Sequence, residues 1–226
     1  MSQPPSILVV TPEKGLLQQI QQDLQGLGHQ VVGVATPHQA LQNLEKQPMA
    51  LLIIDGVHLA AAGVQFCQEV RARGDRTPIL LLLERESLSD RITCLEAGAD
   101  DYLLLPYRSD RFIEQVNFYV QAPTYPEAQL QFGDLCLELN TRRALRGSHG
   151  FDLTMKEFEL LKYLMQHPQQ VVTREQILQN VWGYDFIGES NVIEVYIRYL
   201  RLKLEDQGGK RLIQTVRGVG YVLREA

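Results

Sequence analysis

Ala50-Leu-Leu-Ile-Ile-Asp55 is an apolar run that ends in a carboxylate and is followed by Gly56. A strand that is apolar on both faces is typical of a parallel sheet, because helices cover both faces of such a sheet. In open parallel sheets the functional groups gather at the carboxyl ends of the strands. The sequence therefore predicts that Asp55 lies at the functional edge of a parallel sheet.

On either side of this run, strands and helices alternate through the first half of the chain. The predicted strands are Ser6–Val10, Gln30–Ala35, Ala50–Asp55, Pro78–Leu83 and Asp101–Leu105. The predicted helices are Glu13–Leu27, Pro37–Lys46, Gly63–Arg73, Leu88–Ala97 and Asp110–Gln121. Five strand–helix units in a row predict a doubly wound α/β domain of flavodoxin-like (βα)5 form, with right-handed crossovers.

The length of 226 residues suits two domains, and a hydrophobic content of 45% allows each to bury a core. We expect one domain at residues 1–121, a proline-containing linker at 122–129 and a second domain at 130–226. Residues 1–129 hold 9 Lys+Arg and 15 Asp+Glu, whereas residues 130–226 hold 13 and 12. An acidic first part and a mildly basic second part permit nucleic-acid binding by the second domain.

The sequence contains no apolar run of the length that a membrane helix needs and no recognisable signal peptide. Its three cysteines, Cys67, Cys94 and Cys136, lack the spacing of a metal site, and an odd number fits no complete disulfide framework. We interpret them as reduced core thiols of a cytoplasmic bacterial protein. A redox role for Cys67 or Cys94 is the alternative.

The second half of the chain changes its pattern. Residues 130–153 alternate apolar and polar side chains around turns, which predicts short antiparallel strands. Three helices follow: Met155–Gln166 after a Thr154-x-x-Glu157 capping box, Arg174–Val181 after Thr173, and a third from Ser190 or Asn191 to about Glu205. Leu212–Val216 and Tyr221–Arg224 then form a hairpin around Arg217-Gly-Val-Gly220. This order predicts an α+β winged helix-turn-helix.

The third helix combines a core stripe with an arginine-bearing face. Its buried stripe follows helical spacing at Ile193, Ile197, Leu200 and Leu204. The opposite face presents Asn191, Val195, Arg198 and Leu202, flanked by Glu194 and Arg201. Such a face can enter a major groove, where arginine pairs with guanine or neutralises phosphates. A solvated basic face is the alternative, but the neighbouring helices and hairpin favour DNA binding.

Four segments of the second half resemble the effector domain of OmpR/PhoB-family transcription regulators: Leu153-Thr-x-x-Glu-Phe-x-Leu-Leu161, Val181-Trp-Gly183, residues 191–201, and Thr215-Val-Arg-Gly-Val-Gly-Tyr221. The resemblance implies contacts with double-stranded DNA from Asn191, Tyr196, Arg198, Tyr199, Arg201, Lys203, Thr215 and Arg217. Within this set Thr215 would bind a phosphate and Arg217 would enter the minor groove. The loop 183–190 would reach RNA polymerase, while we interpret Trp182 as a core residue.

The first half resembles the receiver domain of the same regulators at Ala97-Gly-Ala-Asp-Asp-Tyr-Leu103 and at Pro106. An intact receiver has two acidic residues after its first strand, an acceptor aspartate, a hydroxyl residue after its fourth strand, and a lysine before the proline. This sequence keeps the aspartate as Asp55. The remaining positions carry Thr11-Pro12, Leu83 and Leu105, and Glu13 is the nearby spare acid.

These replacements predict an atypical receiver. Phosphoryl transfer to a carboxylate needs Mg²⁺ held by clustered oxygens, and we expect no Mg²⁺ cofactor or other metal here. A phosphoryl group adds about −1.5 to −2 charges, which Leu83 and Leu105 would leave without a partner. The sequence therefore predicts that Asp55 is a vestigial phosphoacceptor.

The resemblance also locates a receiver dimer interface in the last helices and strand. Arg91, Glu96, Asp100 and Asp101 match one side of the family's salt bridges. Their usual partners are replaced by Arg111, Asn117 and Gln115, and Arg91 facing Arg111 would repel. We therefore expect a weak receiver dimer or one that uses different contacts.

These observations favour a DNA-binding transcription regulator of two-component type that binds direct repeats as a pair, without a phosphoryl cycle. Its input would come from a histidine kinase or another protein, from expression level or from a small ligand. One alternative is a conventional switch phosphorylated on Asp55. Others are a receiver used for protein docking, or for sensing a ligand in a pocket lined by Pro12, Asp55, Leu83 and Leu105. An enzyme is not indicated, because no nucleophile–base pair, phosphate loop or metal-ligand cluster is recognisable.

Overall fold

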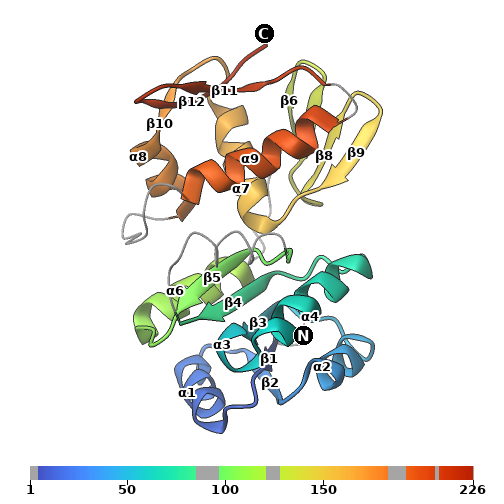
Figure 1. Ribbon diagram of the computed structural model, residues 1–226, viewed down its shortest axis with the longest axis vertical. Coiled ribbons are helices and arrows are strands. Elements are labelled where there is room, and N and C mark those ends of the chain that lie inside the picture. Colours follow the sequence, from blue (N-terminus) through green and yellow to red (C-terminus); the bar gives the residue numbers. More distant parts are fainter. Residues whose placement is uncertain (1–4, 85–96, 121–127, 183–191, 207–208, 226) are drawn as a thin grey trace. The chain divides into compact units, whose positions relative to one another are not determined.

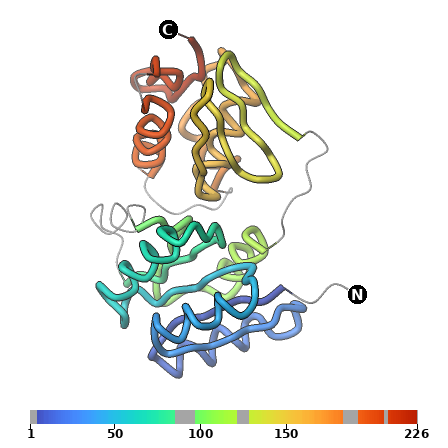
Figure 2. Tube along the Cα trace, turned by 90° about the vertical axis from the view of Figure 1, so that its right-hand side faces the viewer, coloured from blue at the N-terminus to red at the C-terminus, as the bar shows by residue number. Residues whose placement is uncertain are grey.

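The computed structural model describes residues 5–84, 97–120, 128–182, 192–206 and 209–225. The chain divides into two compact units, Met1–Pro123 and Thr124–Ala226, and the division falls inside the expected linker. Figure 1 shows the elements of each unit, and Figure 2 follows the chain from the first unit in blue to green into the second in yellow to red. None of the described helices is long and apolar enough to cross a membrane.

The first unit is the predicted parallel sheet, with strands in the order β2-β1-β3-β4-β5. Its strands are β1 (Ser6–Val10), β2 (Gln30–Val34), β3 (Leu51–Asp55), β4 (Ile79–Leu83) and β5 (Asp101–Leu104). The described helices are α1 (Lys14–Leu24), α2 (Pro37–Leu44), α3 (Gly56–Leu59), α4 (Ala61–Ala72) and α6 (Ser109–Val120). Helix α1 contacts α6, and α2 contacts α4 (Figure 1). The predicted helix Leu88–Ala97 lies outside the described residues apart from its last residue.

The apolar run that predicted this sheet is its most deeply buried strand. Every residue of β3 from Leu51 to Asp55 is at most 1% exposed. Strand β3 lies between β1 and β4, so both of its edges are hydrogen-bonded to neighbouring strands. Burial of such side chains stabilises a fold by about 25 cal/mol per Å² of apolar surface.

The structure adds one helix that the sequence pattern did not predict. Helix α3 is a single turn directly after β3, and α4 begins at Ala61 rather than at the predicted Gly63. Asp55 is the N-cap of α3 and accepts hydrogen bonds from the amides of Val57 and His58. Ala60 then takes a positive φ of 47°, which separates α3 from α4.

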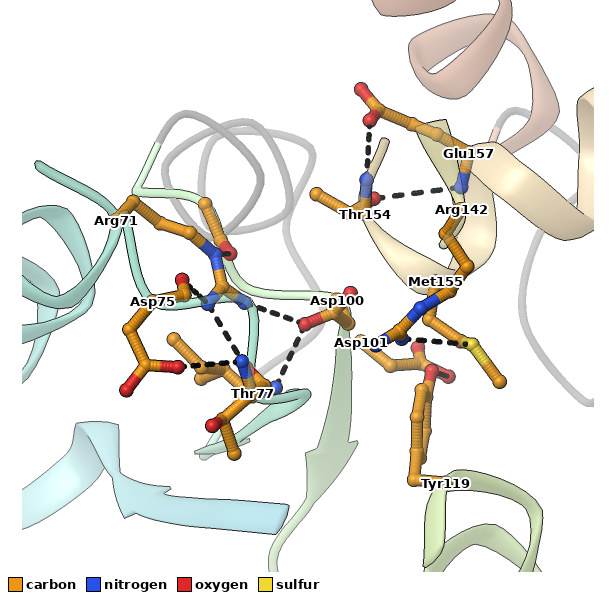
Figure 3. Close-up of polar contacts among 12 residues, drawn as sticks. Arg71, Asp75, Thr77, Asp100, Asp101, Tyr119, Arg142, Thr154, Met155 and Glu157 are labelled. Carbon is orange, nitrogen blue, oxygen red and sulfur yellow. Dashed lines mark hydrogen bonds and ion pairs between the residues drawn. The ribbon is translucent and has the colours of Figure 1, made fainter. Parts of the chain in front are cut away.

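Arg71, on the last turn of α4, connects the ends of two strands (Figure 3). Its guanidinium donates to four acceptors: Gly98 O at 2.9 Å, Asp75 O at 2.9 Å, Thr77 O at 2.9 Å and Asp100 Oδ2 at 2.7 Å. The Asp100 carboxylate is 2% exposed and also accepts from the Ile79 amide at 2.8 Å. This network holds the C-terminus of α4 to the starts of β4 and β5, and it places a cation beside the buried Asp100 carboxylate.

The second unit has the predicted winged helix-turn-helix architecture. An antiparallel sheet comes first: β6 (Gln129–Phe132), β7 (Leu135–Glu138), β8 (Arg143–Arg146) and β9 (His149–Asp152). The helical segments are α7 (Met155–Gln166), α8 (Arg174–Ile177), the π-helical turn η1 (Leu178–Trp182) and α9 (Val192–Glu205). A second sheet, in the order β10-β12-β11, consists of β10 (Val172–Thr173), β11 (Ile213–Val216) and β12 (Gly220–Leu223). Helix α7 contacts both β6 and α9 (Figures 1 and 2).

Two helix starts in this unit confirm the predicted capping residues. The Thr154 amide donates to Glu157 Oε2 at 2.8 Å, and the Glu157 amide donates back to Thr154 Oγ1 at 3.5 Å (Figure 3). Thr173 and Gln176 form the same reciprocal pair at the start of α8. Each box satisfies two amides that a helix start otherwise leaves unpaired, so the helices begin where the sequence places them.

We predict that Arg71→Ala destabilises the first unit by about 3 kcal/mol, because it leaves the buried Asp100 carboxylate without its cation. Urea denaturation of the full chain measures the loss of stability. Hydrogen exchange of peptides from β4 and β5 shows whether the loss lies in the first unit. Arg73→Ala is the matched control, since Arg73 forms only exposed pairs with Glu45 and Glu69. Equal effects of the two substitutions would contradict the assignment.

Candidate nucleic-acid interface and the site around Asp55

Both oxygens of Asp55 are occupied by hydrogen bonds inside the fold. Thr11 Oγ1 donates to Asp55 Oδ2 at 2.6 Å, and His58 Nδ1 lies 2.8 Å from the same oxygen. Oδ1 accepts from the amides of Val57 at 3.1 Å and His58 at 2.9 Å. With 1% exposure, the carboxylate is a buried cap of α3 that accepts from the Thr11 hydroxyl and two amides and also contacts the His58 ring.

Thr11 and Glu13 do not form an acidic cluster beside Asp55. Thr11 is 3% exposed, and its hydroxyl oxygen accepts from the Glu13 amide at 3.1 Å. The Glu13 carboxylate turns to the start of α1 and accepts from the Gly15 amide at 2.9 Å. Magnesium needs several oxygen ligands in octahedral geometry, and these residues do not fit it. Among the described residues no group of three or more His, Cys, Asp or Glu side chains could hold a metal ion.

Leu83 lies close to Gly56, the residue that follows Asp55. The Leu83 side chain packs against the core, and a Cβ on Gly56 would lie 3.2 Å from Leu83 Cδ2 and 2.8 Å from Leu82 O. This close approach explains why glycine follows the aspartate. The Leu105 amide donates to Leu83 O at 2.7 Å, so the two predicted leucines belong to neighbouring strand ends.

His58 is the residue of this site that the sequence pattern missed. Its side chain is 44% exposed and contacts an Asp55 side chain that is not exposed at all, so it lies between the carboxylate and solvent. The spacing Asp55-x-x-His58 places both residues on one helical turn. This signal depends on recognising α3, which is too short to give a periodic pattern.

The predicted receiver-interface residues are engaged inside the first unit. Asp101 is 6% exposed, and Tyr119 Oη donates to its Oδ2 at 2.9 Å (Figure 3). Gln115 Nε2 donates to the Tyr102 carbonyl of the edge strand at 3.3 Å. Arg111 lies 3.7 Å from Glu114 on its own helix. Asp100 is held by Arg71, as described above, whereas Arg91 and Glu96 lie outside the described residues.

Helix α9 buries the predicted stripe. Ile193, Ile197, Leu200 and Leu204 are all at most 2% exposed, which confirms the helical spacing. On the outer face Arg198 is exposed and Leu202 is 59% exposed. Val195 was expected on that face but is only 8% exposed, so this placement was wrong.

Tyr196 requires a second correction. It is 1% exposed, and its ring meets the Trp182 ring edge-on at a centroid distance of 5.3 Å. A side chain buried in this way cannot reach DNA, so Tyr196 belongs to the core rather than to the DNA face. Trp182, predicted as a core residue, is half-buried, and Lys156 Nζ lies 5.7 Å from its ring centroid. Asn191 lies outside the described residues, and Tyr199 is half-buried.

Two of the predicted basic residues hold α9 to its neighbours. Arg201 Nε donates to Ile213 O at 3.0 Å, and Nη2 donates to Thr215 Oγ1 at 2.8 Å. Burial, followed by the nearby positive charge of Arg211, lowers the pKa of Arg201. Lys203 Nζ lies 2.5 Å from Glu157 Oε2, in the capping box of α7. These contacts fix the pose of α9.

Arg198 and Arg217, unlike Arg201 and Lys203, make no polar contacts with the described parts of the domain. Both are exposed, and neither guanidinium forms a hydrogen bond or ion pair within the part of the chain that the structure describes. Arg198 borders an open hollow of about 450 Å³, shared with Arg201, Leu202, Glu205, Asp206 and Arg211. Arg217 stands at the wing turn, where Gly218 has φ 73° and the Val219 amide donates to Val216 O at 3.0 Å. Thr215 is exposed beside it.

A parallel five-stranded unit followed by a winged helix with exposed arginines defines the class of DNA-binding response regulators. Residues 7–117 match the response regulator receiver domain, and residues 148–223 match the C-terminal domain of transcriptional regulatory proteins. The chain is 37% identical over 227 residues to the response regulator MprA of Mycolicibacterium vanbaalenii, with 98% of each chain covered. It is 36% identical over 222 residues to the transcriptional regulatory protein YkoG of Bacillus subtilis, covering 96% of this chain and 97% of that protein.

Solved structures agree with this assignment. A mutant of RitR matches with a TM-score of 0.75 at 27% identity, covering 98% of this chain and 100% of that one. The OmpR/PhoB homologue DrrB of Thermotoga maritima matches with a TM-score of 0.52 at 26% identity over the same shares. The chain belongs to the OmpR/PhoB family of response regulators. It is a DNA-binding transcription regulator of two-component type, and not an enzyme.

The cysteines differ in accessibility. Cys67 is 0% exposed within α4, and burial raises the pKa of its thiol to about 12, while Arg71 acts in the opposite direction. Cys136 is partly exposed on β7, with Sγ 3.4 Å from Gln129 Oε1. Cys94 lies outside the described residues. Because the thiolate is the reactive form, the environment of Cys67 opposes the redox role considered for it.

We predict that iodoacetamide at pH 8 modifies Cys136 and leaves Cys67 intact in the folded protein. A thiol of pKa about 12 has only about one thiolate in 10⁴ at that pH, and its pKa falls to the ordinary range on unfolding. Peptide mass spectrometry of native and urea-unfolded samples measures the difference. Rapid modification of native Cys67 would show that its environment is wrongly described.

Proposed function

We propose that this regulator binds promoter DNA without a phosphoryl cycle at Asp55. The observation that supports the proposal is the set of four donors, from Thr11, Val57 and His58, on a carboxylate that is 1% exposed. An acceptor aspartate must offer a free oxygen to the incoming phosphorus atom. Here every oxygen already has a structural partner, so phosphorylation would break the cap of α3.

The surroundings of Asp55 also oppose a stable phosphoryl group. The added charge of about −1.5 to −2 needs a cation or several donors. Leu83 and Leu105 occupy the positions where the family provides a hydroxyl and a lysine, and desolvating an unpaired charge costs several kcal/mol. The alternative is a conventional switch that uses Asp55, and the experiment below distinguishes the two.

The input to such an atypical receiver then comes from something other than phosphate. Candidates are a protein partner (a histidine kinase or another protein), expression level or a small ligand. Leu83 packs against the core, which favours a protein surface over a ligand pocket around Asp55. The cyanobacterial non-bleaching regulator, an atypical member of the family, is one candidate relative for comparison. We place the protein in the bacterial cytoplasm, where its DNA target lies.

The DNA face in this proposal is formed by α9 and the wing. Arg198 enters the major groove, and Arg217 enters the minor groove from the wing turn. Thr215 contacts a phosphate, with Tyr199 and Asn191 at the edge of the face. Arg201 and Lys203 support the face from within the domain, because they donate hydrogen bonds to β11 and to the capping box of α7. RNA polymerase would be reached through residues 183–190, which lie outside the described residues.

The protein would bind direct repeats as a pair that DNA assembles. The acidic residues expected at the receiver interface, Asp100 and Asp101, are buried and bonded to Arg71 and Tyr119. They are therefore committed inside one receiver. This supports a weak receiver dimer off DNA, as the altered charges of Arg111 and Gln115 also do.

We predict that a small-molecule phosphodonor with Mg²⁺ adds no phosphoryl group to the full-length protein, as read by intact mass. Asp55→Asn, which keeps the size and the acceptor oxygen of the cap, should bind DNA like the wild type. A Thr11→Asp, Pro12→Asp, Leu83→Thr, Leu105→Lys variant restores both acidic residues, the hydroxyl and the lysine, and is the positive control. A stoichiometric mass gain that Asp55→Asn abolishes would refute the proposal.

We further predict that Arg198→Ala weakens binding to a site selected from random DNA by about 1–3 kcal/mol if the arginine reads a base. If it contacts only a phosphate, the loss is similar for all sequences and the salt slope falls by about 1. Fluorescence anisotropy at several salt concentrations separates these outcomes. Arg143→Ala, which removes an exposed charge from β8, is the matched control and should change neither quantity.

A further inference from the structure

Arg174, the first residue of α8, contacts both elements of the proposed DNA face. Its Nε and Nη2 donate to Glu194 Oε1 on α9 at 3.2 and 2.8 Å. Its Cζ lies 5.4 Å from the centroid of the Tyr221 ring on β12. Its backbone amide donates to Val219 O in the wing turn at 3.2 Å. One residue therefore links the first turn of α9, a wing strand and the wing turn.

The chemistry of arginine suits this position. A guanidinium is planar, so it can pair with a carboxylate along its edge and stack on an aromatic ring with its face. Arginine is charged at any physiological pH, and the pair with Glu194 raises the pKa of Arg174 further. A lysine would supply the positive charge but not the planar group that stacks on an aromatic ring.

Arg174 differs from the arginines assigned to DNA contact. Its donors are committed to Glu194 and its face to Tyr221, whose ring is 2% exposed. Arg198 and Arg217 have no such partners among the described residues. Arg174 is therefore engaged inside the domain by Glu194 and Tyr221, whereas Arg198 and Arg217 are exposed without such partners in the part of the chain that the structure describes.

We propose that Arg174 is a positioning residue that sets the geometry between α9 and the wing, so that Arg198 and Arg217 engage adjacent grooves together. The proposal rests on the DNA face described above and adds how its two halves are kept in register. Arg201 supplies a second link through Thr215 and Ile213 on β11, but only Arg174 also touches the wing turn.

Loss of the Arg174 side chain should weaken DNA binding without preventing folding. The Arg174–Glu194 pair is partly exposed, at 29% and 45% of the two side chains, and pairs of this kind contribute little to stability. Arg174→Ala should therefore fold normally, and its backbone amide still donates to Val219 O. What it loses is the rigid spacing between helix and wing.

A double-mutant cycle on the full-length protein tests this coupling. Affinity for the selected DNA site is measured by fluorescence anisotropy for wild type, Arg174→Ala, Arg217→Ala and the double variant. We expect Arg217→Ala to weaken binding about tenfold in the wild type and about threefold or less in the Arg174→Ala background. Glu194→Ala, which removes the partner on α9, should reproduce the reduced coupling, and Arg174→Lys should restore part of it.

Control variants distinguish an error in the role of Arg174 from an error in the DNA face. Arg143→Ala removes a charge elsewhere on the domain and should leave the tenfold effect of Arg217→Ala unchanged. An equal effect of Arg217→Ala with and without Arg174 overturns the proposal. So does a salt slope that falls by about 1 in Arg174→Ala, because that marks a lost phosphate contact. If neither Arg198→Ala nor Arg217→Ala weakens binding in any background, the DNA face itself is wrong.

Discussion

A buried carboxylate must be compensated, and the way Asp55 is compensated determines what the first domain can do. In this protein the compensation comes from the hydroxyl of Thr11, the ring of His58 and two amides of α3. These donors hold the end of β3, the start of α3 and the loop after β1 in one arrangement. In the function that we propose, a metal ion or a phosphoryl group would have to replace them, so a phosphate switch would compete with the stability of the fold.

In the second domain, some charged side chains are paired with groups of the domain itself, and others are exposed without such partners among the described residues. Arg174, Arg201 and Lys203 are paired with groups of the domain itself, and these pairs hold α9 against the wing and against α7. Arg198 and Arg217 are exposed and available. A recognition surface needs both kinds: cations that bind the ligand lose less freedom on binding when their supporting elements are already fixed.

The sequence pattern predicted most helices and strands, but it did not predict which way every side chain faces. The stripe of α9 and the capping boxes at Thr154 and Thr173 were predictable, because spacing and local hydrogen bonding decide them. Tyr196 and Val195 were placed on the wrong face because packing against neighbours such as Trp182 widens the buried side of the helix beyond its apolar stripe. Helix α3 and the role of His58 were missed, since a single turn has no periodicity.

The sequence by itself determined the two-domain order, the parallel sheet ending at Asp55 and the winged helix, because hydrophobic periodicity and turn residues act over short distances. Through the family resemblance it also predicted that the receiver is atypical. Only the tertiary structure decided which charges are paired inside the protein. Asp55 with Thr11, Asp100 with Arg71, and Arg174 with Glu194 are far apart or on different elements, and their pairing depends on distances that folding alone creates.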